Sequence, residues 1–292
     1  MKGKKLKVVT SIFPLKEIAQ AVGGKQAEVE LLLPPGAEPH TWEPKPSDII
    51  RLSTADIFIY IGAGMEPWIY DILKGVRNPE LIVMEASHGL TLIRREEAEQ
   101  RGEEDYEHGR KHFHESEFDP HVWLDFDYAQ RIVEKITGFF IGKNPDSTDY
   151  YQANAEAYKK KLQSLDKKYR EALKECHHRE MIYGGHAAFA YLVRRYGLKQ
   201  ISLYGISPDS EPTPKRLARI IEFAKRHRIR VIYFDAFVSD KLARAIARDV
   251  GAETLVLNTG ANLTREQLKS GVTFLSMMEE NLENLRYGLE CR

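Results

Sequence analysis

Short, strongly hydrophobic runs alternate with longer amphipathic stretches through the first half of the chain. Short apolar runs bounded by turn residues indicate buried β-strands, whereas hydrophobic residues that recur every three or four positions indicate helices. The predicted strands span residues 7–12, 28–33, 57–61 and 81–84, and the predicted helices include residues 14–22, 46–53 and 128–141. This alternation favours a mostly parallel sheet with helices on its faces.

The second half of the chain repeats the pattern. Its predicted strands span residues 180–183, 200–204, 230–234 and 254–257, and its predicted helices include residues 214–227, 240–249 and 265–287. Because 292 residues exceed the size of an ordinary single domain, two lobes are the natural division. We therefore predict an α/β protein with two lobes, each a mostly parallel sheet flanked by helices.

A long amphipathic helix is predicted between the lobes, at residues 148–175. At 1.5 Å per residue such a helix extends roughly 40 Å, and we expect it to be a rigid link. The predicted domains are an N-terminal metal-binding lobe at residues 1–147, this linking helix, and a C-terminal metal-binding lobe at residues 176–292.

The balance of charge excludes some partners. Lys plus Arg and Asp plus Glu both number 43, so no global field attracts nucleic acid. No apolar run approaches the length that spans a bilayer. Residues 1–7 are basic but lack the apolar core of an export signal, so we expect either a cytoplasmic protein or a mature chain whose signal has been removed.

The two cysteines, Cys176 and Cys291, are too few and too far apart for a zinc ribbon or a Cys-x-x-Cys redox pair. One long-range disulfide in an oxidising compartment and two free thiols both remain open, because the sequence fixes no distance between them.

Three polar residues lie just past the ends of predicted strands, and each is a candidate metal ligand. His40 lies past the strand at residues 28–33, His186 follows the strand at residues 180–183, and Asp235 ends the strand at residues 230–234. Ligands of open α/β sheets bind outside the carboxyl ends of the strands. The alternative interpretation is structural, since a histidine there is often only hydrogen-bonded and Asp235 could cap the next helix.

His121 is a fourth candidate, in the sequence Asp-Pro-His-Val-Trp-Leu-Asp at residues 119–125. The proline stiffens the approach, and Asp119 and Asp125 are available to accept a hydrogen bond from the imidazole. Together, His40, His121, His186 and Asp235 would offer three nitrogens and one oxygen, a set that suits tetrahedral Zn²⁺ better than Mn²⁺.

The remaining histidines have weaker claims. His88 and His227 are interpreted as surface residues near helix or turn ends. His177 and His178 are interpreted as ending the long helix, with adventitious metal binding as the alternative. The charged segment at residues 94–117 lacks apolar periodicity and predicts a mobile surface loop, whose histidines at positions 108, 112 and 114 form either a weak metal-collecting element or a plain solvated loop.

These motifs resemble those of the cluster A-I substrate-binding proteins, the zinc- and manganese-uptake family of ABC transporters. The segments at residues 33–44, 119–125 and 185–192 are similar to the three metal-histidine motifs of that family, and residues 211–214 to a characteristic turn. The resemblance spans essentially the whole chain in the right order.

The resemblance implies two α/β lobes joined by a backbone helix, with metal at their interface and His40, His121 and His186 at ligand positions. Histidine at the third position, where manganese members carry Glu, resembles the zinc branch, as does the charged loop. Two positions depart from the pattern: Phe126 replaces a proline, and Asp235 stands where relatives often have Glu. Since its side chain is shorter, water or Asp240 is the alternative fourth ligand.

We therefore expect a monomeric extracytoplasmic receptor, not an enzyme, that binds Zn²⁺ and delivers it to an ABC permease. One rival is a zinc hydrolase, although the sequence has no His-Glu-x-x-His motif, no Gly-x-Ser-x-Gly elbow and no phosphate-binding glycine loop. The other rival is a receptor for Mn²⁺ or another divalent ion, or an adhesin, of the same family.

Overall fold

The structure is a computed structural model that describes residues 5–99, 117–205, 212–235, 237 and 240–292. Its contacts divide the chain into two compact units, each assembled from separate stretches. Unit 1 comprises residues 1–90, 126–165 and 260–275, and unit 2 comprises residues 91–125, 166–259 and 276–292. The predicted division into a metal-binding lobe at residues 1–147, a linking helix at residues 148–175 and a metal-binding lobe at residues 176–292 stays a prediction.

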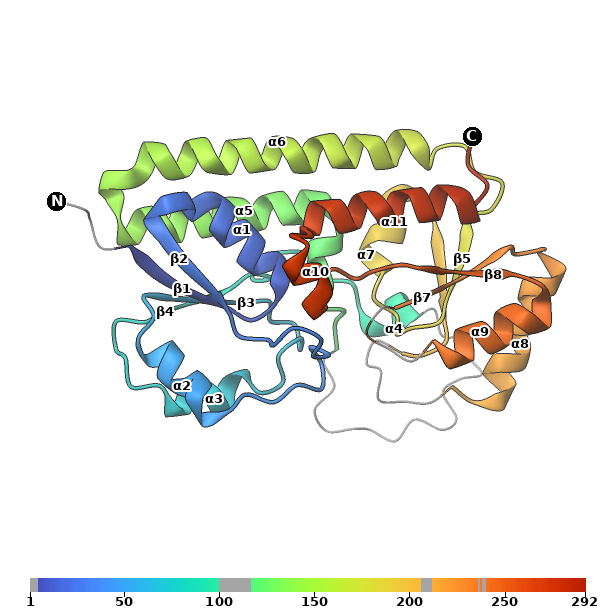
Figure 1. Cartoon of the computed structure of the whole chain (residues 1–292), viewed down its shortest axis with the longest axis horizontal. Coiled ribbons are helices and arrows are strands. Elements are labelled where there is room, and N and C mark those ends of the chain that lie inside the picture. The colour runs from blue at the N-terminus through green and yellow to red at the C-terminus, as the bar shows by residue number, and fades with distance from the viewer. Residues whose placement is uncertain (1–4, 100–116, 206–211, 236, 238–239) are drawn as a thin grey trace. The chain divides into compact units, whose positions relative to one another are not determined.

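Unit 1 contains one parallel four-stranded sheet in the order β2-β1-β3-β4. Its strands are β1 (Leu6–Thr10), β2 (Ala27–Leu31), β3 (Ile57–Tyr60) and β4 (Ile82–Glu85). Its complete helices are α1 (Phe13–Gly23), α2 (Pro46–Ser53), α3 (Ile69–Gly75), α5 (Phe126–Lys143) and α10 (Arg265–Lys269). Figure 1 shows α2 and α3 on one face of this sheet and α1 and α5 on the other.

Unit 2 contains a second parallel sheet, in the order β6-β5-β7-β8. Its strands are β5 (Glu180–Tyr183), β6 (Lys199–Ser202), β7 (Val231–Phe234) and β8 (Glu253–Val256). Its complete helices are α4 (Arg95–Glu99), α7 (Ala190–Tyr196), α8 (Pro214–Arg226) and α9 (Lys241–Val250). The two sheets have the same strand order, so the predicted repetition of one α/β plan is confirmed.

Hydrophobic side chains fix each sheet to its helices. In unit 1, Val9 and Phe58 of the sheet pack with Leu52 of α2 and Ile72 of α3. In unit 2, the corresponding cluster joins β5 and β7 to α8 and α9. Burying such side chains provides most of the free energy that holds a helix on a sheet.

Two helices contribute residues to both units. The predicted linking helix is α6 (Thr148–Ala172), which ends three residues before the predicted boundary at residue 175. The predicted helix at residues 265–287 is two helices, α10 and α11 (Phe274–Gly288). The helix breaks because Gly271 takes φ +72°, a left-handed conformation that glycine adopts without strain and that typically ends a helix. With regard to membranes, none of the helices in the described ranges is both long and apolar enough to cross a bilayer.

Candidate metal centre

Two of the predicted ligands, His121 and His186, meet inside unit 2. Nε2 of His121 lies 3.1 Å from Nε2 of His186, and both side chains are buried. Two zinc–nitrogen bonds of about 2.0–2.1 Å at a tetrahedral angle would place their nitrogens about 3.3 Å apart. The spacing of this pair therefore suits two imidazoles that share one ion.

Asp119 orients the His121 ring. Its Oδ1 lies 2.7 Å from Nδ1 of His121 and accepts the backbone N–H of the same residue at 2.9 Å. When Nδ1 carries the proton, its N–H donates a hydrogen bond to the carboxylate, and Nε2 keeps its lone pair and faces His186. Metal-ligating histidines usually show this arrangement. The predicted acceptor role of Asp119 is confirmed, whereas Asp125 forms an ion pair with Arg195 at 2.9 Å.

Short-range structure holds this segment in place. After His121 the chain forms a 3-10 turn at Val122–Leu124. The indole N–H of Trp123 donates to the carbonyl of Thr259 at 2.8 Å, and the hydroxyl of Tyr191 donates to the carbonyl of Asp119 at 2.9 Å. These buried contacts fix the backbone on both sides of the imidazole.

Two glycines let the chain turn sharply between β5 and His186. The N–H of Gly184 donates to the carbonyl of Tyr233 at 2.6 Å, and a Cβ on Gly184 would lie 2.6 Å from the Cβ of Ala243. A Cβ on Gly185 would lie 2.7 Å from the ring of Tyr183. Side chains at either position would force these neighbours apart, so the glycines are what allow His186 to follow the strand so closely.

Asp235 directly follows β7 and is buried near His121. Its Oδ2 accepts the hydroxyl of Tyr183 at 2.9 Å, and its Oδ1 accepts the backbone N–H of Phe237 at 2.8 Å. Burial raises the pKa of the Asp235 carboxyl, while the two hydrogen bonds and the charge of His121 act in the opposite direction. When ionised, the Asp235 carboxylate keeps lone pairs that its two hydrogen bonds do not use, and these could bind a metal ion. Asp235 as the fourth ligand stays a prediction. Its alternative, Asp240, forms an ion pair with Arg244 at 2.6 Å.

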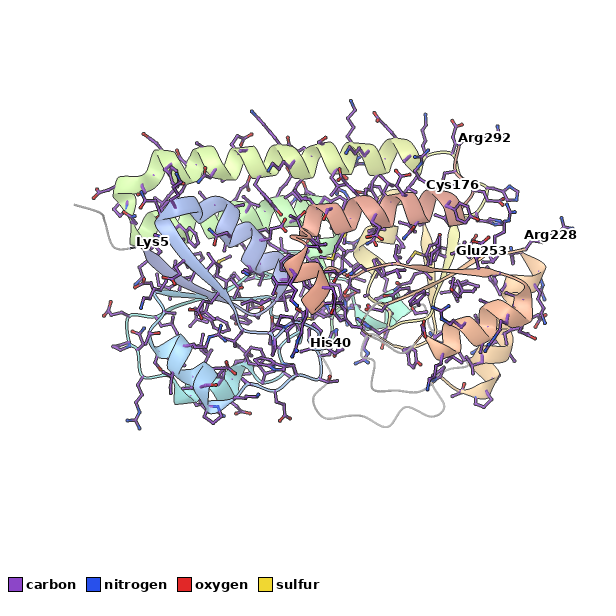
Figure 2. All side chains as sticks on the ribbon, in the orientation of Figure 1. Lys5, His40, Cys176, Arg228, Glu253 and Arg292 are labelled. Atoms are coloured by element: carbon purple, nitrogen blue, oxygen red, sulfur yellow. A yellow bond between two sulfur atoms is a disulfide. The ribbon has the colours of Figure 1, made fainter. Side chains whose placement is uncertain are left out.

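His40 belongs to unit 1, on the loop that leaves the carboxyl end of β2; Figure 2 labels it. The side-chain amide of Asn262 braces this loop by donating to the carbonyls of Pro34 and Ala37, both at 2.8 Å. Gly36, at φ +85°, donates its N–H to the carbonyl of Leu263 at 2.8 Å. Sequence reasoning missed Asn262, because no local pattern connects it with a loop more than 200 residues away.

The other predicted residues take varied positions. The carbonyl of His88 accepts a hydrogen bond from Lys135, and the ring of His227 stacks on Phe223 at 4.1 Å. The two cysteines form a disulfide, which resolves the two states that the sequence left open. Most of the predicted loop at residues 94–117, including its three histidines, lies outside the described residues.

A parallel α/β fold with two buried histidines that meet, His186 after the end of a strand and His121 oriented by a carboxylate, defines the chain as a metal-binding α/β protein. More particularly, it belongs to the family described as zinc-uptake complex component A, periplasmic, whose model matches residues 8–288. The predicted family is thus confirmed.

Its relatives carry names that refer to zinc. The chain is 39% identical over 288 residues to the high-affinity zinc uptake system protein ZnuA of Bacillus subtilis, covering 99% of this chain and 89% of that protein. It is 39% identical over 282 residues to the zinc-binding lipoprotein AdcA of Streptococcus pneumoniae, covering 97% of this chain but only 55% of AdcA.

Solved structures resemble the whole chain. The Zn(II)-bound ZnuA-like domain of Streptococcus pneumoniae AdcA has a TM-score of 0.80 at 36% identity, with 98% of this chain and 99% of that chain covered. The laminin-binding protein Lmb of Streptococcus agalactiae, described as bifunctional with adhesin and metal-transporting activity, has a TM-score of 0.82 at 29% identity, with 97% and 99% covered.

Proposed function

We propose that this protein binds one Zn²⁺ ion with high affinity outside the membrane and delivers it to an ABC-type uptake permease. The observation that carries the proposal is the buried pair of imidazole nitrogens, 3.1 Å apart, with one ring held by Asp119. The names of relatives such as ZnuA and AdcA support zinc as the cargo. In this proposal the protein works as a monomer, and neither nucleic acid nor any substrate other than the ion is a partner.

The proposed ligands are His40, His121 and His186, with Asp235 or a water molecule in the fourth position. His40 joins the set because its loop carries the first motif of the family. Three imidazoles and at most one carboxylate form a nitrogen-rich set, which favours Zn²⁺ over Mn²⁺. Because an imidazole must be neutral to bind metal, the affinity falls as the pH drops towards and below about 6.

The test is a competition between Zn²⁺ and Mn²⁺ for the full chain at fixed pH, repeated from pH 5 to pH 8. The expected result is that zinc wins by orders of magnitude at pH 7 and that its affinity declines on acidification. Equal affinities for the two ions, or a zinc affinity that does not change with pH, would contradict the proposal.

A receptor differs from a zinc hydrolase in what it does with the bound ion. In this proposal the ion is cargo, and the protein catalyses no reaction. We expect no hydrolysis of simple esters above the rate with free zinc. Zinc-dependent hydrolysis by the wild-type protein that disappears in His121→Ala would support the enzyme instead.

Adhesion is a second candidate, because the laminin-binding protein Lmb shares this fold over nearly the full length of both chains. A solid-phase assay with immobilised laminin tests it, with and without zinc. Saturable binding would add adhesion to the proposed transport, and its absence would leave transport alone.

A further inference from the structure

A second group of metal-binding side chains lies in unit 2, where the segment after α6 meets the end of α11. His177, His178 and Glu290 each offer one ligand atom, and these atoms all lie within 4.8 Å of one another. We propose that this His177–His178–Glu290 cluster is a second zinc site, which binds Zn²⁺ more weakly than the buried pair. The proposal concerns residues that take no part in the proposed uptake site.

The backbone joins the two segments firmly. A disulfide links Cys176, the residue before His177, to Cys291, the residue after Glu290. The N–H of His177 donates to the carbonyl of Glu290 at 3.3 Å, and the N–H of His178 donates to the carbonyl of Leu289 at 3.1 Å. Figure 2 labels Cys176 and the C-terminal Arg292, which mark the two segments. The ligands are therefore brought together by the fold before any ion binds.

The two imidazoles lie on the same side of the chain. Neighbouring side chains of an extended segment point in opposite directions. Here the chain bends at His177, and the ring centroids of His177 and His178 are 4.6 Å apart with the planes at 78°. Adjacent histidines in this arrangement can direct nitrogens towards one point.

Glu290 adopts a backbone conformation that is unusual for its residue type. Its φ is +53°, in the left-handed region that glycine enters without strain and that a residue with a Cβ rarely occupies. The position follows the end of α11, where glycine is the usual choice. A glutamate here keeps the strain and places a carboxylate beside the two histidines, where it also pairs with Arg230.

The distances leave one carboxylate oxygen for the ion. Oε1 of Glu290 accepts from Arg230 at 2.5 Å, whereas Oε2 lies 3.9 Å from Nε2 of His178. That separation is too long for a hydrogen bond. A tetrahedral zinc ion with bonds of about 2.0–2.2 Å would hold the two atoms about 3.4 Å apart, so they need to move together by only about 0.5 Å.

Burial and charge set the strength of this second site. His178 is only 9% exposed, whereas His177 is exposed. The carboxylate of Glu290 attracts a cation, and the guanidinium of Arg230 that pairs with it opposes one. Because His177 is exposed and Arg230 is close, the cluster binds zinc more weakly than the buried pair does.

Calorimetric titration of the full chain with Zn²⁺ tests the proposal. The key variant is His177→Gln with His178→Gln, and the control is His88→Gln, which removes an imidazole in unit 1. We expect the key variant to lose one equivalent of weak binding while the tight event is unchanged, and the control to keep both. Equal stoichiometry in the two variants would overturn the proposal.

A milder variant, Glu290→Gln, covers the case in which the double variant fails to fold. It preserves the shape of the side chain and both imidazoles but removes the anionic ligand. We expect the weak event to lose at least about tenfold in affinity, since even a partner that only orients a ligand contributes 10–100-fold. An unchanged weak event in a folded Glu290→Gln protein would overturn the second site. Absence of the tight event in wild type would instead contradict the proposed function.

Discussion

Unit 2 contains two groups of imidazoles, which differ in how deeply they are buried and in how a neighbouring carboxylate is used. His121 and His186 are only 1% and 4% exposed, and a carboxylate that makes no ion pair with Lys or Arg among the described residues orients the first ring. His177 is exposed, and the carboxylate of its cluster, Glu290, is shared with Arg230. If both groups bind zinc as we propose, burial and orientation, more than the identity of the ligands, decide which histidines bind it tightly.

Removing a ligand from the buried pair is expected to have the largest effect. If four ligands share an apparent zinc-binding free energy of about 10–16 kcal/mol, one ligand contributes about 3–4 kcal/mol, or up to about 1,000-fold in affinity. His121→Ala should therefore lose tight binding by that factor in a chelator competition, while the weak event remains. His88→Ala is the control and should match wild type. A loss of less than tenfold in His121→Ala would place the tight site elsewhere.

Removing the disulfide should lower the stability of the fold and weaken zinc binding at the His177–His178–Glu290 cluster. The bond between Cys176 and Cys291 closes a loop with a sequence separation of 115. Constraining a loop of that length stabilises a fold by up to about 4 kcal/mol. Cys176→Ser with Cys291→Ser should lower the free energy of unfolding in urea by about that amount and weaken the second zinc event, yet leave the tight event intact. Loss of tight binding in a protein that is still folded would show that the two groups are coupled.

Zinc affinity and the stability of the metal-free fold should respond to pH in opposite directions. Burial raises the pKa of Glu66 to about 7, against hydrogen bonds from Ser11, Ile61 and Gly62 that lower it. The folded state then binds this proton more tightly than the unfolded chain, so the stabilisation is complete below about pH 4.5 and is lost as the pH rises through 7. The difference corresponds to about 3 kcal/mol.

The variant Glu66→Gln tests this sign. Between pH 4.5 and pH 7.5 the free energy of unfolding of the metal-free wild type should fall relative to that of the variant. Zinc affinity should change in the opposite direction, because the imidazoles lose their protons as the pH rises. Parallel pH profiles of wild type and variant would show that Glu66 does not hold its proton in the folded state.

Disturbing the orientation of His121 should have the smallest of these effects. Asp119→Asn keeps the size of the side chain but removes the charge beside Nδ1, and loss of such a partner costs about 10–100-fold in metal affinity. Asp125→Asn is the matched control, because that carboxylate pairs with Arg195 and should affect stability instead. Equal zinc affinities in the two variants would show that orientation of the His121 ring by Asp119 does not strengthen zinc binding.

The sequence predicted the fold well where its signals are local. The strand at residues 180–183 has the predicted bounds, and the other seven strands differ from their predicted bounds by at most two residues at either end. The predicted helix at residues 265–287 was wrong as a single element. Its amphipathic pattern continues across the break, and only the left-handed conformation of Gly271 ends the first helix.

The site divides in the same way. His121 with Asp119, and His186 after its glycines, could be predicted because each group lies within a few residues of sequence. The brace from Asn262 to the His40 loop and the pairing of Glu290 with His178 could not, because each joins segments more than 100 residues apart. Contacts of this kind depend on the folded backbone and leave no pattern in the sequence.

We propose that a zinc ion binds between Nε2 of His121 and Nε2 of His186. The decisive measurement is diffraction from crystals of the protein loaded with one equivalent of zinc, collected on both sides of the zinc absorption edge. We expect one strong anomalous peak at about 2.0–2.1 Å from both nitrogens. A dominant peak at His177, His178 and Glu290, with none between His121 and His186, would contradict it.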